Sequence, residues 1–439
     1  MRPKRVIIMG AAGRDFHCFN TLFRENPDYR VVAFTATQIP RIDDRSYPPE
    51  LAGRLYPEGI PIRPLEQLEE LVRRHAVDVC YFCYSDVSYV EVMQVGARVL
   101  AAGAGFAFLP PQASMLKSSR PVVSVVAVRT GSGKSQTTRY IAGILKRLGR
   151  RTAVIRHPMP YGSLLKQRVQ KFETLADLGD QNCTIEEMEE YEPHLNEGNV
   201  VFAGVDYSEI LRAAEEAAEV ILWDGGNNDA TFLQSDLMIT VADPYRAGNE
   251  LLYYPSEFNL RMADVVVINK VATAHPEQVE KLQASVRKHN PQAAVILCNS
   301  PVSTATPEAI TGRRVLLVED GPTVTHGEMN IGAAYIAAQE YGAKEIVDPR
   351  PYARGSIAEA YRKFPHLTQV LPALGYFPEQ LRELEETIAA VDCDSVVVGT
   401  PIDLTRVVKI PQAAVRVTYR LEEREPGRLE AALRQHLGL

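Results

Sequence analysis

Residues 122–135 read VVSVVAVRTGSGKS, and this stretch decides the fold of the central part of the chain. Its β-branched, apolar first half, Val122–Val128, predicts a buried parallel strand, and Gln136–Arg147 predicts a helix. A strand, a glycine loop and a helix in this order are the setting of a phosphate-binding loop, in which backbone N–H groups and a helix N-terminus face phosphate oxygens. The sequence therefore predicts a nucleoside triphosphate site.

Within this loop the residue types predict separate roles. Lys134 is expected to reach the β- and γ-phosphates as a catalytic residue, and the Ser135 hydroxyl to bind Mg²⁺. The predicted nucleotide contacts at the loop are Thr130, Gly131, Ser132, Gly133, Lys134, Ser135 and Gln136. The alternative is a chance glycine turn that carries a surface lysine.

The loop departs from the pattern G-x-x-x-x-G-K-[ST], because Val128 stands at the first glycine. It fits the variant K-G-G-x-G-K-[ST] better, with Arg129 at the leading basic position and Thr130 in place of one glycine. In such NTPases the leading basic residue often reaches the phosphates of a partner subunit. Arg129 is therefore predicted to be catalytic, and we expect a homodimer.

Two further strand ends fit a nucleotide site. Asp224 ends the apolar run ILWD and is predicted to be catalytic and to hold Mg²⁺ through water, while Gly225 and Gly226 let the backbone pass close to a γ-phosphate. The alternative is an aspartate that caps a loop. Asn269 and Lys270 resemble the base-reading N-K-x-D element of GTPases and are expected to flank the base.

The base-reading element lacks its carboxylate. Its aspartate position is Ala272, which would leave two guanine donors unpaired at a cost of roughly 1–3 kcal/mol. The predicted ligands are therefore ATP, rather than GTP, and Mg²⁺.

Composition narrows the class of protein. The chain has 439 residues, 46% of them hydrophobic, which favours two or three globular domains. Its net charge of −7 argues against broad nucleic-acid binding. The sequence lacks an apolar run of about 20 residues and a signal peptide, so we expect no membrane partner and a cytoplasmic location.

The order of predicted elements indicates an α/β fold in three parts. Residues 1–119 alternate strands and helices as a Rossmann-like substrate- or anion-binding domain does, and residues 120–300 fit a P-loop NTPase domain with a parallel sheet. Residues 301–439 form a C-terminal α/β segment, whose packing the pattern does not fix. A polar helical stretch is expected from Lys166 to Glu190.

Cations gather after the second central strand and suggest a site for an anionic small molecule, since Arg suits bidentate contacts with phosphate or carboxylate. The candidates there are Arg156, His157, Lys166, Arg168 and Lys171. Arg246 follows another strand end, and Arg14 and His17 follow the first glycine loop, GAAGRDF. The alternatives are a solvated basic helix face and, for the glycine loop, a dinucleotide fingerprint whose third glycine is Phe16.

Taken together, these residues resemble the cyclic 2,3-diphosphoglycerate synthetase family over nearly the whole chain. The stretches that carry the resemblance are GAAGRDFHCFN, SVVAVRTGSGKSQTTRY, VIRHPMPYG, WDGGNND, ITVADPYRAGNELLYYP, VVINKV, EDGPTVTHGEMNIGAAY and VVVGTPIDL. The resemblance implies an ATP-dependent ligase that closes 2,3-diphosphoglycerate, or a related phosphorylated acid, into an intramolecular anhydride. The alternatives are a nucleotide-dependent switch or metallochaperone-type NTPase, and a nucleotide-binding scaffold without turnover.

Overall fold

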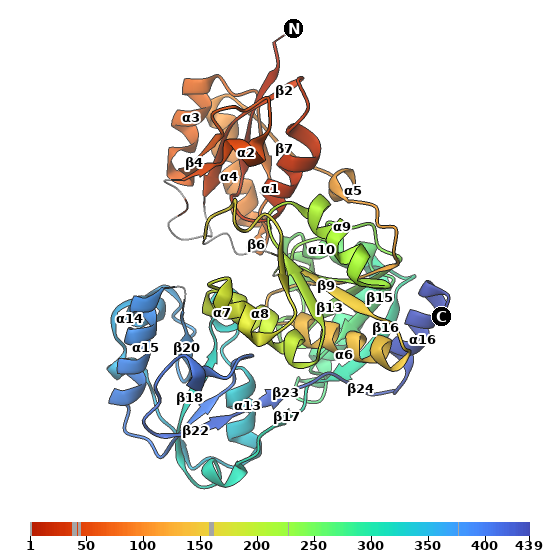
Figure 1. Cartoon of the computed structure of the whole chain (residues 1–439). Coiled ribbons are helices and arrows are strands. Elements are labelled where there is room, and N and C mark those ends of the chain that lie inside the picture. The colour runs from red at the N-terminus through yellow and green to blue at the C-terminus, as the bar shows by residue number, and fades with distance from the viewer. Residues whose placement is uncertain (1, 37–41, 43–44, 158–161, 227, 376) are drawn as a thin grey trace.

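The computed structural model describes residues 2–36, 42, 45–157, 162–226, 228–375 and 377–439. It has the predicted α/β architecture, and in the described residues three large sheets and two two-stranded ribbons are formed (Figure 1). Among the described residues, no helix is both long and apolar enough to cross a bilayer.

The N-terminal sheet has the strand order β3-β4-β2-β1-β5-β7, and its pairs are parallel except β3 with β4. Its strands are β1 (Lys4–Met9), β2 (Tyr29–Ala36), β3 (Ser46–Tyr47), β4 (Ile60–Pro64), β5 (Val79–Phe82) and β7 (Gly105–Phe108). Its helices are α1 (Arg14–Cys18), α2 (Pro49–Ala52), α3 (Leu68–His75), α4 (Tyr89–Ala102) and α5 (Pro111–Ser114). The short strand β6 (Val87–Ser88) leaves this domain to pair with β14 (Tyr253–Tyr254) of the central domain.

The central sheet has nine strands in the order β10-β11-β9-β12-β8-β13-β15-β16-β24, parallel except at its two ends. The strands are β8 (Val122–Ala127), β9 (Thr152–Arg156), β10 (Gln170–Phe172), β11 (Val200–Ala203), β12 (Val220–Asp224), β13 (Leu237–Ala242), β15 (Val265–Ile268), β16 (Ala294–Asn299) and β24 (Glu422–Glu423). The helices are α6 (Lys134–Arg147), α7 (Leu175–Asp180), α8 (Ile185–Asn196), α9 (Tyr207–Ala217), α10 (Ser256–Met262), α11 (Pro276–His289) and α16 (Arg428–Leu437). Every residue of β8 is buried, as its continuous apolar run predicts.

The predicted continuous helix from Lys166 to Glu190 is wrong. Strand β10 and helices α7 and α8 occupy this segment and its continuation. Thr174 and Thr184 each form a capping box with the acidic residue three positions later, which starts a new helix at each site. A polar segment with two such start signals forms two short helices instead of one long helix.

The C-terminal sheet is parallel and has β18 at its centre. Its strands are β18 (Arg314–Asp320), β19 (Glu345–Ile346), β20 (Leu371–Ala373), β21 (Ser395–Val398) and β22 (Ala413–Arg416), and its helices are α12 (Gly321–Val324), α13 (Ala333–Glu340), α14 (Gly355–Lys363) and α15 (Pro378–Ala390). The chain enters through β17 (Val302–Ser303) and leaves through β23 (Thr418–Tyr419), which pair as an antiparallel ribbon.

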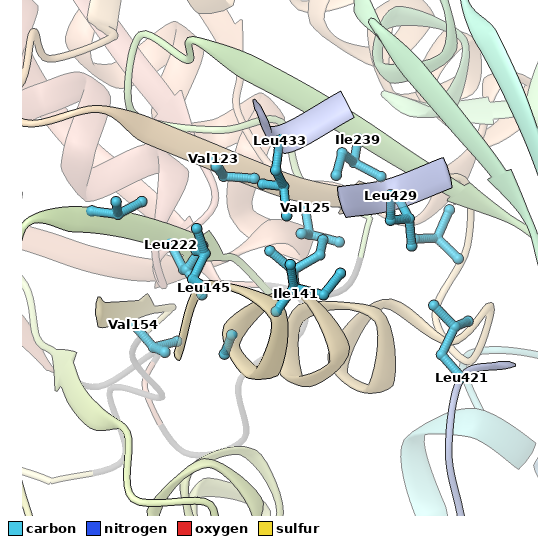
Figure 2. Close-up of a cluster of buried hydrophobic side chains, with 14 of the residues drawn as sticks. Val123, Val125, Ile141, Leu145, Val154, Leu222, Ile239, Leu421, Leu429 and Leu433 are labelled. Atoms are coloured by element: carbon cyan, nitrogen blue, oxygen red, sulfur yellow. The ribbon is translucent and has the colours of Figure 1, made fainter. Parts of the chain in front are cut away.

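The third segment of the chain is divided between two domains. After the ribbon, β24 joins the central sheet beside β16, and α16 packs on the same domain (Figure 1). Leu421, Leu429 and Leu433 are buried in one cluster with Val123 of β8 and Ile141 of α6 (Figure 2). The end of the chain therefore completes the core beneath the phosphate-binding loop.

Candidate active site

The loop between β8 and α6 has the backbone that its glycines predict. Gly131 and Gly133 adopt φ values of +81° and +108°, in the left-handed region that disfavours side chains. A Cβ at Gly133 would lie 2.1 Å from Asn269 Nδ2, and one at Gly131 would lie 2.8 Å from Thr323 Cγ2. Neither position has room for a side chain, so the loop lies tightly between the central and C-terminal domains.

Asn269 and Lys270, which directly follow β15, contact this loop. Asn269 Nδ2 donates a hydrogen bond to the Ser132 carbonyl at 3.1 Å, and Lys270 Nζ donates one to the Gly131 carbonyl at 2.6 Å. The sequence placed both residues at the nucleotide site, and the structure brings both to the loop. Their expected contact with the base stays a prediction.

Asp224 is the centre of a buried charge cluster. Its carboxylate accepts from Lys134 Nζ at 2.5 Å and His194 Nε2 at 3.0 Å, and Arg156 Nη1 lies 2.6 Å from it. Burial alone would raise the pKa of Asp224, but the cations of Arg156 and Lys134 hold that pKa well below its usual range. Burial, with Arg156 close by, lowers the pKa of Lys134 to about 8. Asp224 is therefore an anion that positions the loop lysine.

Arg129 joins all three domains and is only 1% exposed. Its guanidinium pairs with Asp86 of the N-terminal domain at 2.9 Å and Glu328 of the C-terminal domain at 3.2 Å. It also lies 3.5 Å from the centre of the Tyr253 ring of the central domain. These partners all belong to this chain, so contact with a partner subunit's nucleotide, like the homodimer itself, stays a prediction.

Arg246 has a similar structural position. It donates to the Thr130 carbonyl at 2.8 Å and also contacts Asp243 and the Gly327 carbonyl. The side chain predicted to bind substrate thus ties the phosphate-binding loop to the C-terminal domain.

The loop opens into a pocket of about 1320 Å³, part of it open to solvent, between the central and C-terminal domains. Lys134, Ser135 and Gln136 line it on the side of α6. Residues of α8, of the carboxyl end of β18 and of β23 also line it. Five carboxylates that the sequence analysis did not single out line the pocket, namely Glu186, Glu189, Glu190, Glu319 and Asp320.

Two of these acids are held by backbone and hydroxyl groups. Glu319 accepts from the Tyr335 N–H at 2.8 Å, and burial raises its pKa to about 7. Asp320 caps α12 by accepting from the Thr323 N–H at 3.2 Å. Both stand where β18 ends, at the edge of a parallel sheet where ligands bind. The ED that follows the apolar run of this strand is the signal that could have found them.

The other predicted substrate residues are not brought together at this pocket. Arg168 pairs with Glu209, Lys171 pairs with Glu173 at 2.9 Å, and Lys166 is exposed. Arg156 is committed to Asp224 and Glu190.

The N-terminal candidates contact the central domain. Arg14 pairs with Asp229 at 2.6 Å, and His17 lies 2.7 Å from the Ser114 carbonyl and stacks on Phe232. His157 lies so close to the first glycine loop that a Cβ at Gly13 would be 1.6 Å from its Nε2. These three side chains therefore join domains.

Among the described residues, no group of three or more His, Cys, Asp or Glu side chains has the arrangement of a metal site. Ser135 nevertheless lines the pocket, and a hydroxyl is a ligand that Mg²⁺ accepts. Gly225 and Gly226 are not among the residues that line the pocket, and they lie close to Trp223 and His157. The Mg²⁺ roles of Ser135 and Asp224 stay predictions.

A protein of Thermococcus kodakarensis, arginine synthetase ArcE, is 56% identical to this chain over 434 residues, which cover 99% of this chain and 97% of that protein. The chain belongs to the arginine synthetase ArcE family. No protein-family model matches it. The resemblance to the cyclic 2,3-diphosphoglycerate synthetase family stays a prediction.

Solved structures give only loose likenesses. LpxK of Aquifex aeolicus, solved with ATP, is 12% identical with a TM-score of 0.46, covering 84% of this chain and 99% of its own. The hydrogenase maturation factor HypB of Archaeoglobus fulgidus is 17% identical with a TM-score of 0.27, covering 41% and 81%.

Proposed function

We propose that this chain is an ATP-dependent synthetase that forms arginine. One observation carries the proposal: the phosphate-binding loop, with Lys134 and Ser135, shares a pocket with five carboxylates. The loop suits a triphosphate, and the carboxylates suit a cationic amino acid. The name of the relative that is 56% identical gives the same product.

The loop residues have the chemistry that ATP and Mg²⁺ need. The left-handed glycines keep side chains out of the space beside the loop, and the α6 N-terminus adds partial positive charge there. Lys134 would neutralise the β- and γ-phosphates, and Ser135 would bind Mg²⁺, which neutralises further charge on the triphosphate. To contact the phosphates, Lys134 must leave Asp224. Arg156 and His194 would then still lie beside the Asp224 carboxylate.

The chemistry of the product defines the acceptor. Arginine differs from citrulline at one position, where a nitrogen replaces the ureido oxygen. ATP can activate that oxygen by transferring its γ-phosphoryl group to it, with ADP as the leaving group. Ammonia then forms the new C–N bond, the C–O bond breaks, and phosphate leaves. The sum is citrulline, ammonia and ATP to arginine, ADP and phosphate, with excess protons released to water.

An amino acid with a positively charged group, such as citrulline with its α-ammonium or arginine with its guanidinium, fits the pocket better than 2,3-diphosphoglycerate does. Arg168 and Lys171, which were expected to hold that polyanion, pair with surface acids and do not line the pocket. The carboxylates that line the pocket would repel the two phosphates of that acceptor. For these reasons we favour arginine synthesis over cyclisation.

The test is an end-point assay with ATP, Mg²⁺, ammonium and citrulline. We expect arginine and ADP in a one-to-one ratio, and ADP release that depends on citrulline. ADP release that depends on 2,3-diphosphoglycerate instead would indicate the cyclising ligase. Slow hydrolysis without any acceptor would indicate the nucleotide-dependent switch.

A further inference from the structure

Glu189 of α8 is a buried acid that lines the same pocket as the phosphate-binding loop. Its side chain is 8% exposed and lines the pocket. Its Oε1 has no hydrogen-bond partner among the described residues. A buried carboxylate without a partner costs free energy, so such groups are normally paired with a cation or a donor.

The surroundings of Glu189 are negative. After burial itself, Asp320 and Glu186 are the causes that raise the pKa of its carboxyl group well above the ordinary value. A positively charged ligand group beside Glu189 would offset the repulsion from Asp320 and Glu186. It would also replace the hydration that Glu189 loses on burial.

The cations that line the pocket have other partners. Lys134 pairs with Asp224, Arg129 with Asp86, and Arg139 lies 3.6 Å from Glu197. Lys270 donates to the Gly131 carbonyl. Glu190, beside Glu189 in sequence, pairs with Arg156. None of these cations therefore pairs with Glu189, and its Oε1 remains without a hydrogen-bond donor among the described residues.

We propose that Glu189 binds the positively charged nitrogen group of the amino-acid substrate or product, an ammonium or a guanidinium. The inference rests on the proposed function and adds the subsite. A carboxylate accepts charge-assisted hydrogen bonds from both groups, and from a guanidinium it accepts two. Glu189 and Lys134 line the same pocket, so a ligand held by Glu189 shares that pocket with the triphosphate that the loop is proposed to bind.

The test compares the wild type with Glu189→Gln, which keeps the shape of the side chain and removes its charge. Calorimetry with an ATP analogue and Mg²⁺ present measures the affinity for arginine, citrulline and lysine. We expect roughly a 10- to 100-fold loss of affinity for arginine, the loss of a charge-assisted hydrogen bond, with the affinity for the ATP analogue within about twofold of the wild type. Thermal unfolding confirms that the variant is folded.

Glu192→Gln is the matched control. Glu192 is on the same helix and is also buried, but it does not line the pocket and pairs with Arg406 at 3.1 Å. This variant is expected to bind arginine and the ATP analogue as the wild type does.

Each outcome decides one part of the proposal. A loss for arginine alone shows that Glu189 holds the guanidinium, and a loss for citrulline as well shows that it holds the α-ammonium. Unchanged affinity for both, or a raised Mg²⁺ requirement without a change for either, overturns the subsite.

The proposed function fails separately. If the wild type makes arginine and Glu189→Gln binds it normally, only the subsite is wrong. If the wild type binds lysine through Glu189 but makes no arginine, only the function is wrong. Wild-type protein that binds none of the three amino acids overturns both.

Discussion

Replacing Arg129 with alanine should destabilise the protein by about 3–5 kcal/mol, because the change leaves the buried Asp86 carboxylate without its cation. The Asp86 side chain is 2% exposed and contacts Arg129 and Thr130. In the variant it would keep only the hydrogen bond from the Thr130 hydroxyl, at 2.6 Å. Glu328 is 52% exposed, so its share is about 0–1 kcal/mol. Loss of the contact with the Tyr253 ring adds roughly 1–2 kcal/mol.

The assay is urea unfolding followed by the fluorescence of Trp223, the only tryptophan in the sequence, which is buried in β12. A double-mutant cycle with Asp86→Asn should give a coupling energy of at least about 1 kcal/mol. Arg54→Ala is the control, because its pair with Glu25 is exposed and is worth about 1 kcal/mol or less. A value for Arg129→Ala as small as that of the control would refute the view that Arg129 holds the three domains together.

Three further changes test the loop and a buried acid of α8, Glu187. Lys134→Ala should abolish ATP turnover in a coupled assay of ADP release while the far-UV circular dichroism stays that of the wild type; near-normal turnover would reject the site. Gly133→Ala should weaken ATP binding at least about tenfold in a titration, since the new Cβ would meet Asn269 at 2.1 Å in a strained backbone; unchanged affinity would contradict the observed loop geometry. Burial raises the pKa of Glu187 to about 7 from an ordinary 4.5, so the wild type loses stability as pH rises from about 4.5 to 7. Glu187→Gln should remove that loss, so its melting temperature relative to the wild type should be higher at pH 8 than at pH 5; a difference independent of pH would show that Glu187 does not titrate in this range.

The loop and its supports could be predicted because their signals are local. A buried apolar strand, glycines at φ values that exclude side chains, and a lysine at the start of α6 are all properties of one short stretch. A second short pattern predicted that Asn269 and Lys270 flank the base; the structure shows them bonded to the loop, and their contact with the base stays a prediction.

The ED at the end of β18 is a local signal, but its meeting with the acids of α8 at one pocket could not be predicted, because α8 and β18 are distant in sequence and meet only in the packed fold. The density of cations after β9 was misleading for a related reason. Sequence spacing does not show that Arg156 is buried against Asp224 or that Arg168 faces Glu209. Partners supplied by other segments determine whether a charged side chain is available to a ligand.

The return of the chain to the central domain has a consequence for biosynthesis. A ribosome makes β8 and α6 early, yet Leu429 and Leu433 of α16 are the residues that cover part of their apolar surface. A nascent or prematurely terminated polypeptide therefore exposes this hydrophobic patch to chaperones and proteases. Burial of the patch requires translation to continue through α16, more than 280 residues after α6, so the nucleotide-binding core is finished only after the C-terminal sheet has been made.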